Sequence, residues 1–559
     1  MPHVVTQSCC ADASCVVACP VNCIHPAPGE PGFATAEMVY VDASSCVDCG
    51  ACVTACPAGA IVPHTRLEPA QLPFLGLNAE YYQVFPHADR TPLALVPEQR
   101  RLRRRGPFRV AIVGAGPAGM YAADELLKHP EIGVDVYDRL PTPYGLVRAG
   151  VAPDHRHTRE VERLFSQIEQ ERGFRYFLDV EIGKHLSHAE LAMRYDAVLY
   201  TVGAASDKPL SVPGDTLAGS LSATDVVGWY NGHPDKQETP VRLDADACGS
   251  GRAVIVGNGN VALDCARLLC LDPESLASTD IADPALEVLR GSAVREVVVL
   301  GRRGPAEAAF TVPELLGLAG HPGLNVVADL GGLRAEEVFA ADGPGGPTTK
   351  SRILRELVDR VPEPGKRTIV LRFAASPVRI VGEERVTGVK VGRNRLETTA
   401  AGTVRAVPTG RTELIEAGLV LRAVGYRGLP VADLPYDADT GTVTNRAGRV
   451  RSGVYVAGWV KRGPTGFIGT NKTDAQETVE AILDDLDTGL CPVPTGTAEE
   501  TAAVVRRRQP GVVDREGWRA IDAEERRRGA AAGRPRVKIT DLSELRRIAA
   551  RATAGTRAR

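Results

Sequence analysis

From residue 108 onward, short apolar runs typical of strands alternate with stretches whose apolar residues have helical spacing. A short β-branched run, RVAIV, is followed by a glycine-rich turn, a stretch with helical spacing and a second apolar run, VDVYD. The same succession returns from Ala253, as AVIV, a glycine-rich turn, a helical stretch and VREVVVLG. Strands that alternate with helices predict a parallel sheet covered by helices. Two such units predict two dinucleotide-binding domains of the α/β type.

The N-terminal stretch follows neither pattern. Nine of the 13 cysteines precede residue 57, and residues 1–66 carry five acidic side chains against one basic side chain. At about 150 residues per domain, 559 residues predict three or four domains. The predicted division is 1–66 (iron–sulfur domain), 67–105 (linker), 106–213 and 419–490 (the two parts of the first nucleotide domain), 214–418 (the second nucleotide domain) and 491–559 (a C-terminal extension with helical pieces). The linker is expected to pack partly on a neighbour, and its basic run RRLRRR is expected to be a solvated hinge or, as the alternative, to dock an acidic partner.

Composition restricts the class of protein. Hydrophobic residues make up 44% and charged residues 24%, which is ordinary for a globular protein. The formal net charge of −3 gives no reason to expect a nucleic-acid partner, and no apolar run approaches the roughly 20 residues of a membrane span. The first residues, MPHVVTQSCC, lack the charged and apolar regions of a secretory signal. We therefore expect a cytoplasmic protein whose cysteines bind metal rather than form disulfides.

The later cysteines have a specific spacing, Cys46-x-x-Cys49-x-x-Cys52-x-x-x-Cys56-Pro57. This is the spacing of bacterial ferredoxins, in which three thiolates bind one iron–sulfur cluster and the cysteine before proline binds the other cluster. A zinc ribbon would need only paired cysteines. The spacing therefore predicts an iron–sulfur domain of the two-cluster, α+β type.

The earlier cysteines repeat this frame with one change, because Asp12 occupies the place of the middle thiolate. The frame predicts a 4Fe–4S cluster on Cys19, Cys46, Cys49 and Cys52, and leaves three thiolates for the other site. Three thiolates suit a 3Fe–4S cluster, or a 4Fe–4S cluster whose labile fourth iron takes Asp12 or water. The remaining ligands are Cys9, Cys15 and Cys56, while Cys10 and Cys23 fall outside the frame and are expected to be buried thiols.

The first glycine-rich turn is Gly114-Ala-Gly116-Pro-Ala-Gly119. Its glycines allow the tight turn, the approach of a pyrophosphate and the packing of helix on strand. Asp138 ends the following strand, where a carboxylate accepts hydrogen bonds from a ribose and would repel a 2′-phosphate. The turn therefore suits FAD or NAD. Two apolar strands that end in glycine, at 195–203 and 454–458, favour FAD.

The second glycine-rich turn is Gly257-Asn-Gly259-Asn-Val261-Ala262. At the position equivalent to Asp138, this unit carries Arg302 and Arg303. Two guanidiniums can bind a 2′-phosphate, so the second site is predicted to prefer NADPH to NADH. The helix after this turn carries a Cys-x4-Cys pair at 265 and 270, which resembles a redox disulfide but is expected to be two core thiols, because residues five apart on a helix point in different directions.

Four stretches show a resemblance to ferredoxin–NADP reductases of the adrenodoxin-reductase type, in the form with a fused N-terminal ferredoxin. They are LPTPYGLVRAGVAPDH (140–155), VGNGNVALDCAR (256–267), GRRGPAEAAFTVPEL (301–315) and VAGWVKRGPTGFIGTN (456–471). Residues 1–66 resemble a seven-iron bacterial ferredoxin. The resemblance implies that FAD takes a hydride from NADPH and passes single electrons to iron–sulfur clusters of the fused domain, of a separate ferredoxin or of another one-electron acceptor protein.

The resemblance also implies roles for individual residues. His155 and Glu314 are expected at the junction of flavin and nicotinamide, where they orient and tune charge rather than transfer the hydride. FAD is expected near Ala115, Asp138, Leu146, Val180, Trp459, Gly466, Phe467 and Ile468. NADP is expected near Asn258, Gly259, Asn260, Val261, Arg302, Arg303 and Glu314, with Gly466 close to the nicotinamide and with Lys208 where relatives often have arginine.

Two other functions remain open on the sequence, and a third is excluded. The chain could be a subunit that feeds electrons to a larger partner, as in glutamate-synthase-like enzymes. It could be a structural or iron-sensing module on a degenerate flavoprotein. A disulfide reductase would need a cysteine pair after the first glycine-rich turn, and the sequence has none there. For the reductase itself, the acidic N-terminal domain is expected to dock electrostatically on the remainder of the chain.

Overall fold

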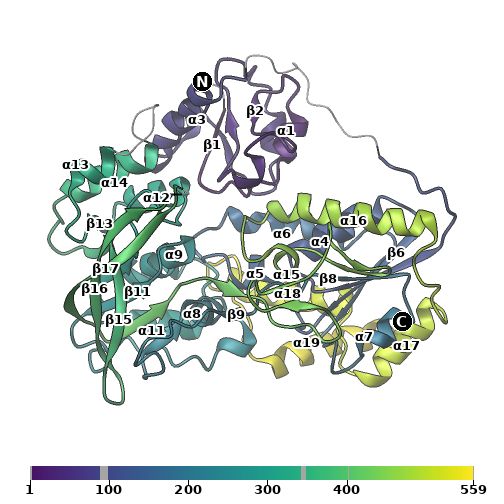
Figure 1. Ribbon diagram of the computed structural model, residues 1–559. Coiled ribbons are helices and arrows are strands. Elements are labelled where there is room, and N and C mark those ends of the chain that lie inside the picture. Colours follow the sequence, from purple (N-terminus) through teal and green to yellow (C-terminus); the bar gives the residue numbers. More distant parts are fainter. Residues whose placement is uncertain (1–2, 88–98, 341–347, 401, 558–559) are drawn as a thin grey trace.

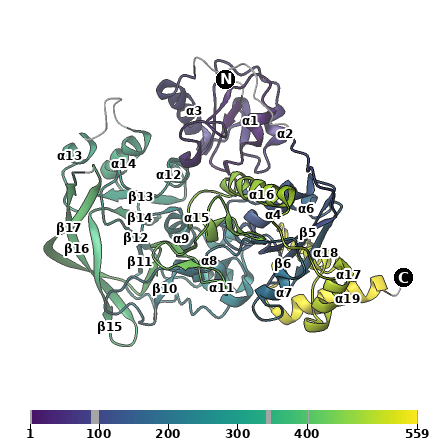
Figure 2. The same ribbon diagram turned by 45° about the vertical axis from the view of Figure 1, so that its right-hand side comes forward.

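The computed structural model describes residues 3–87, 99–340, 348–400 and 402–557 (Figure 1). The chain forms two lobes, each built on a six-stranded sheet, and a smaller N-terminal unit. Figures 1 and 2 show that this N-terminal unit, in purple, lies over both lobes.

The N-terminal unit is built from short strands and helices around its cysteines. β1 (His3–Val5) pairs with β4 (Ile61–Pro63), and β2 (Ile24–His25) pairs with β3 (Tyr40–Val41), both antiparallel. The helices α1 (Ser14–Ala18) and α2 (Ala51–Ala55) each run into a Cys-Pro pair. This α+β arrangement agrees with the predicted class.

The N-terminal unit extends beyond its predicted end at residue 66. Helix α3 (Pro73–Val84) packs on it, with Phe74 and Leu77 buried in its core. The Asn78 side chain accepts hydrogen bonds from the backbone N–H groups of Val5 (3.3 Å) and Val41 (3.0 Å) and so ties the helix to two strands. The first part of the predicted linker therefore belongs to this unit, because its apolar helix face covers the strands.

The second part of the connector is not a solvated hinge. Arg100 pairs with three carboxylates on the exposed face of α16 (Thr470–Thr488), at 3.0 Å from Glu480, 2.7 Å from Asp484 and 2.9 Å from Asp487. The basic run thus lies along an acidic helix of the same chain. Residues 88–98 of the predicted linker lie outside the described residues.

The first lobe carries the sheet β22-β23-β8-β5-β6-β7. Its strands from β23 to β7 run parallel, and they are nearly continuous apolar segments, as expected for a sheet covered on both faces. Helices α4 (Pro117–Leu127) and α16 pack against each other on it. The strand bounds are β5 (Phe108–Val113), β6 (Ile132–Asp138), β7 (Phe174–Leu178), β8 (Ala197–Tyr200), β22 (Arg449–Arg451) and β23 (Val454–Val456).

The second lobe carries the parallel sheet β10-β18-β11-β12-β14-β13. Its strands are β10 (Ser220–Ser222), β11 (Arg252–Val256), β12 (Glu296–Leu300), β13 (Leu324–Asp329), β14 (Arg367–Arg372) and β18 (Leu419–Arg422). Its helices include α8 (Ala223–Tyr230), α9 (Asn260–Cys270), α11 (Asp283–Arg290), α12 (Val312–Ala319) and α14 (Thr349–Asp359). An antiparallel sheet of β15 (Ala375–Gly382), β16 (Val386–Thr398) and β17 (Val404–Glu416) flanks it.

Two boundaries differ from the sequence prediction. The predicted end of the second domain at residue 418 cuts off β18, which pairs with β10 and β11, so this lobe continues through Arg422. The C-terminal extension is no tail: α17 (Ala498–Arg508), α18 (Arg515–Ala531) and α19 (Leu542–Arg557) follow the first lobe, whose core includes Trp518, Ile521 and Leu545. Burial of these apolar side chains makes the extension part of the lobe.

Candidate functional site

Three cysteines and one aspartate gather on one side of the N-terminal unit. Burial, with smaller contributions from the neighbouring Cys56 and Asp12, raises the pKa of Cys9 to about 11. Burial likewise raises the pKa of Cys15, which has Cys9, Asp12 and Cys56 as its neighbours. The fold therefore brings Cys56, from the second half of the motif, to the cysteines of the first half, as the crossing rule predicts.

A second group of cysteines gathers apart from the first. Burial raises the pKa of Cys52 to about 11, and its thiol neighbours are Cys46, Cys19 and Cys49. Cys23 is buried beside this group, with its sulfur 3.4 Å from the Cys19 sulfur. All 13 cysteines are free thiols. Convergent sulfurs that form no disulfide fit an iron–sulfur cluster.

Asp12 holds a defined position within the three-cysteine group. Its side chain is only 4% exposed, and the Ser14 hydroxyl donates a hydrogen bond to its Oδ2. Lys472, on α16 of the first lobe, donates to the Ser14 Oγ at 2.8 Å and lies 3.6 Å from the Asp12 carboxylate. Burial raises the pKa of Tyr121 on α4, and nearby Cys10 and Asp12 add to the shift. The three-cysteine group is thus the one that faces the first lobe.

The first glycine-rich turn leaves an open face at the start of α4. A Cβ at Gly114 would lie 2.6 Å from the Thr201 carbonyl oxygen, and one at Gly119 would lie 2.1 Å from the Gly114 oxygen. A Cβ at Gly116, the N-cap of α4, would meet nothing nearer than 3.9 Å. Packing therefore requires two glycines, while the third leaves the helix N-terminus open to a phosphate, which fits the pyrophosphate of FAD.

The other residues expected around FAD lie on the same lobe. Asp138 ends β6 and accepts hydrogen bonds from the Ala115 N–H (2.8 Å) and the Leu140 N–H (2.9 Å); burial raises its pKa. Leu146 follows Gly145, whose Cβ would lie 3.0 Å from Gly116, and its side chain is 38% exposed. Val180 is buried next to β6, where its N–H donates to the Asp138 oxygen at 2.8 Å.

The second glycine-rich turn repeats this geometry on the second lobe. A Cβ at Gly257 would lie 2.2 Å from the Ala423 oxygen, whereas Gly259, the N-cap of α9, has nothing within 4 Å. The amides of Asn258 and Asn260 bond the segment before α12, and Val261 is partly buried behind them. Arg302 is exposed and Arg303 half-buried, and neither guanidinium has a protein partner within the described residues. Two free cations here suit a 2′-phosphate.

The remaining expected residues lie where the two lobes meet. Trp459 begins α15 (Trp459–Arg462), stacks at a tilt on Tyr426 with 5.1 Å between ring centroids, and donates to the Thr465 oxygen at 3.2 Å. Tyr426 belongs to β19 (Tyr426–Arg427), which pairs with β9 (Ser206–Asp207) to join the lobes. Lys208 is exposed directly after β9. The loop from Gly466 through Phe467 and Ile468 leads into α16.

His155 and Glu314, both expected at the junction of flavin and nicotinamide, lie together, with the imidazole Nε2 3.8 Å from the Glu314 carboxylate. Burial raises the pKa of Glu314. Asp264 on α9 shares this cluster, held by Arg267 at 2.7 Å. The final member is one that sequence reasoning missed: Gln7 of the N-terminal unit donates a hydrogen bond to Glu314 at 2.9 Å. Nothing in a lone glutamine near the N-terminus marks such a contact.

The N-terminal unit docks on both lobes, as expected, while the electrostatic origin of this docking stays a prediction. On the first lobe, the Gly469 N–H donates to the Cys10 oxygen at 2.8 Å. On the second lobe, Glu37 accepts from the Val312 N–H at 2.7 Å, and Glu80 pairs with Arg352 at 2.7 Å. Docking therefore presents the three-cysteine group to the loop before α16 and Gln7 to the His155–Glu314 pair.

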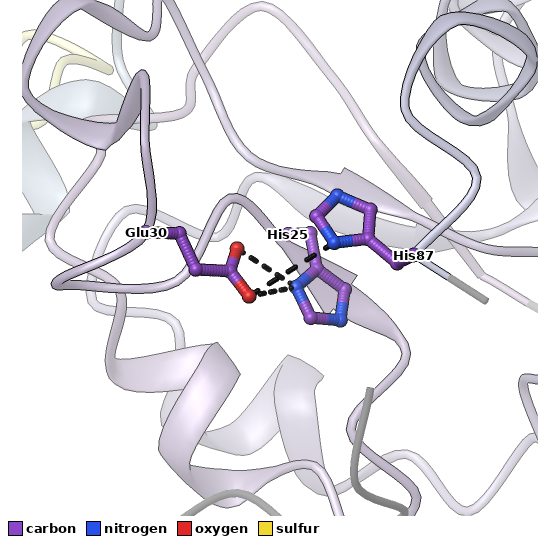
Figure 3. Close-up of side chains that lie close together, drawn as sticks. All are labelled: His25, Glu30 and His87. Carbon is purple, nitrogen blue, oxygen red and sulfur yellow. Dashed lines mark hydrogen bonds and ion pairs between the residues drawn. The ribbon is translucent and has the colours of Figure 1, made fainter. Parts of the chain in front are cut away.

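A histidine cluster lies within the N-terminal unit (Figure 3). Buried His25 bonds the Asn22 oxygen through Nε2 (2.9 Å) and Glu30 through Nδ1 (2.9 Å), and His87 Nδ1 lies 4.0 Å from Glu30. The two imidazoles stack with centroids 4.1 Å apart and planes at 20°, so their lone pairs run side by side instead of converging on one ion. The arrangement fits a clamp that fastens the connector after α3, rather than a metal centre.

Two further expectations concern residues away from the site. Cys265 and Cys270 are buried core thiols on α9, as predicted, with exposures of 1% and 2%. Burial raises the pKa of Cys270 to about 12. Within the described residues, the helices are all too short or too polar to cross a lipid bilayer.

Comparison with known proteins agrees with the two kinds of site. Residues 108–283 match the family "Pyridine nucleotide-disulphide oxidoreductase", and residues 39–62 match "4Fe-4S binding domain". A "Probable ferredoxin/ferredoxin--NADP reductase" of Mycobacterium leprae is 50% identical over 98% of both chains. The human mitochondrial "NADPH:adrenodoxin oxidoreductase" is 38% identical over 87% of this chain and 96% of its own. The structure of Mycobacterium tuberculosis FprA in complex with NADPH is 45% identical, with a TM-score of 0.74, over 79% of this chain and all of that one.

Proposed function

The chain belongs to the family of ferredoxin–NADP reductases, in the form that carries an N-terminal iron–sulfur domain, and we propose from this premise that it moves electrons between NADPH and iron–sulfur clusters through FAD. When bound, FAD supplies the conversion from a two-electron hydride donor to one-electron acceptors. The residues of the chain bind these groups, orient them and keep the distance for electron transfer between them short.

The observation that carries the proposal is the position of the N-terminal unit. It contacts the loop before α16 through Cys10 and Gly469, and it contacts Glu314 through Gln7. A ferredoxin unit that served only a distant partner would have no reason to touch both lobes next to the expected flavin–nicotinamide junction. Fixed contacts of this kind replace diffusional encounter by an intramolecular step.

We assign the nucleotide groups to the two open helix N-termini. FAD would lie along Gly116 and α4, with Asp138 accepting from its ribose; NADP would lie along Gly259 and α9, with Arg302 and Arg303 on its 2′-phosphate. His155 and Glu314 would orient the nicotinamide. The full FAD set is Gly114, Ala115, Gly116, Gly119, Asp138, Leu146, Val180, Trp459, Gly466, Phe467 and Ile468, and the full NADP set is Gly257, Asn258, Gly259, Asn260, Val261, Arg302, Arg303, Glu314 and Lys208.

We assign two clusters to the N-terminal unit. Cys19, Cys46, Cys49 and Cys52 would hold a 4Fe–4S cluster, and Cys9, Cys15 and Cys56 would hold a 3Fe–4S cluster. The three-cysteine group adjoins the first lobe, whereas Cys49 is exposed on the other group. Electrons would therefore enter on the three-cysteine side and leave on the four-cysteine side, toward a separate ferredoxin or another one-electron acceptor.

An anaerobic NADPH titration, followed by visible absorption and EPR, tests the proposal. We expect flavin bleaching, a three-iron EPR signal in the oxidised protein and the transfer of electrons to both clusters. Protein that stays colourless after reconstitution with iron, sulfide and flavin, or whose clusters stay oxidised beside a fully reduced flavin, would overturn it.

Other assignments are less favoured. The subunit alternative is not supported, since relatives named as reductases match over 98% of this chain. A disulfide reductase has no support in the buried Cys265 and Cys270. A cytoplasmic location is part of our proposal, because every cysteine is a free thiol.

A further inference from the structure

The Asp12 carboxylate, which occupies the place of the missing thiolate, is in contact with a lysine of the first lobe. Asp12 lies among Cys9, Cys15 and Cys56, where its oxygen could bind a fourth iron. In the docked structure, its Oδ2 instead accepts from Ser14 and lies 3.6 Å from the Lys472 ammonium. Lys472 also donates to the Ser14 oxygen at 2.8 Å, so it holds both side chains. It belongs to α16, which follows the loop that docks on Cys10.

We propose that Lys472 sets the number of irons at the three-cysteine site by withholding Asp12 from iron. The inference rests on the cluster assignment proposed above. While Lys472 pairs with Asp12, the site keeps three irons. Without Lys472, a carboxylate with 4% exposure loses its only cationic partner within the described residues, and a buried unpaired charge is costly. A ferrous ion on the fourth corner would then compensate that charge.

The iron step is an addition. One ferrous ion joins the singly reduced three-iron cluster, an iron–oxygen bond forms to Asp12, and the Asp12–Lys472 ion pair breaks. The reduced cluster and the ferrous ion together carry the charge of an ordinary four-iron core, so the step needs no further electron and no sulfide. Lys472 is a positioning residue in this scheme, because it acts through Asp12.

The same contact links iron content to docking. Lys472 reaches Asp12 only because α16 lies against the N-terminal unit, where the Gly469 N–H bonds the Cys10 oxygen at 2.8 Å. A domain that undocks therefore frees Asp12, and ferrous iron can then complete the cluster. A three-iron site is the signature of the docked arrangement.

The test compares Lys472→Met with the unsubstituted chain and with a matched control, Arg352→Met. Arg352 also makes one ion pair across this interface, but with Glu80 on α3 instead of Asp12. Each full-length holoprotein is reduced chemically without NADPH, titrated with ferrous ion, desalted and reoxidised. The loss of the three-iron EPR signal and the iron-to-protein ratio then measure conversion.

We expect Lys472→Met to convert at about one-tenth of the ferrous concentration that the unsubstituted chain requires. The loss of a charge-assisted contact worth roughly 1.4 kcal/mol corresponds to a tenfold change in the equilibrium constant for iron binding. Lys472→Arg and Arg352→Met are expected to convert like the unsubstituted chain. The double variant Asp12→Asn with Lys472→Met should resist conversion. Equal conversion of Lys472→Met and unsubstituted protein, or an equal effect of Arg352→Met, would overturn the inference alone. The absence of any three-iron signal from the unsubstituted chain would overturn both this inference and the cluster assignment.

Discussion

A single added methyl group at Gly469 should separate the N-terminal unit from the first lobe. A Cβ at this position would lie 2.2 Å from the Asp12 nitrogen, 2.4 Å from the Asp12 Cα and 2.5 Å from the Ala11 carbonyl carbon. All three are backbone atoms, so no flexible side chain can move aside. Ordinary carbon contacts need about 3.5–4.0 Å, so the two surfaces must part by more than about 1 Å in Gly469→Ala.

The size of the effect follows from these contacts. Such a separation breaks the Gly469 N–H bond to the Cys10 oxygen, now 2.8 Å. Overpacking costs about 1–3 kcal/mol and the lost hydrogen bond about 0.5–1.5 kcal/mol. The free energy of docking should therefore weaken by about 2 kcal/mol or more, which shifts the docked population against the undocked one by about 30-fold.

The assay separates the two halves of electron transfer. Stopped-flow absorption under anaerobic conditions follows flavin reduction by NADPH and then cluster reduction in the same sample. In Gly469→Ala we expect normal flavin content and normal flavin reduction, with slowed cluster reduction. Gly76→Ala on α3 is the matched control, because a Cβ there meets nothing within 4 Å. Cluster reduction at the unsubstituted rate in Gly469→Ala, with flavin intact, would show that this contact does not hold the two units together.

Three further predictions concern single side chains. Replacing Arg302 or Arg303 by alanine should raise KM for NADPH about tenfold or more and leave KM for NADH unchanged, since each replacement removes a charge-assisted phosphate contact worth about 1.5–3 kcal/mol. Steady-state kinetics with both nucleotides test this, and a parallel rise in both KM values would contradict it. Gln7→Ala removes a hydrogen-bond donor that favours ionised Glu314, so the pKa of Glu314, already raised by burial, should rise further and move the pH profile of flavin reduction to higher pH. An unchanged pH profile would show that Gln7 does not affect the ionisation of Glu314. Burial raises the pKa of Glu169 to about 7 from 4.5, so the folded state keeps a proton that the unfolded state loses, and stability falls as pH rises between these values. Glu169→Gln should therefore gain up to about 3 kcal/mol in the free energy of unfolding relative to the unsubstituted chain at pH 8, and little at pH 5. Tm measured as a function of pH tests this, and a gain of equal size at both pH values would contradict it.

Local chemistry leaves a clear record in the amino-acid sequence. Gly119 is required by a contact with the Gly114 oxygen in its own turn, and such a requirement imposes a fixed spacing, whereas Gly114 is required by the Thr201 carbonyl group, 87 residues away after β8. The cysteine frame is local for the same reason, because a chelating loop must be short. The interpretation of Arg302 and Arg303 needs only their place after β12. These short-range features are sufficient to indicate the family.

The boundaries of the units are harder to predict from the sequence. The sequence of helix α3, PFLGLNAEYYQV, is rich in apolar and aromatic residues but does not show which surface it covers, and its attachment depends on Asn78, 73 residues from Val5. The extension from 491 has the composition of a tail, although Trp518 is 3% exposed in the core of the first lobe. Neither partner surface can be identified from the helix alone.

The order of the amino acids specifies which cofactors this protein is built for, because each binding motif is a short segment whose spacing is imposed by the group it holds. Which cysteine group meets the first lobe is settled by packing in three dimensions, as are the contacts of Lys472 with Ser14 and of Gln7 with Glu314. These partners lie 458 and 307 residues apart in the chain. Contacts at such separations arise from the packing of whole units, and a single sequence carries no periodicity that records them.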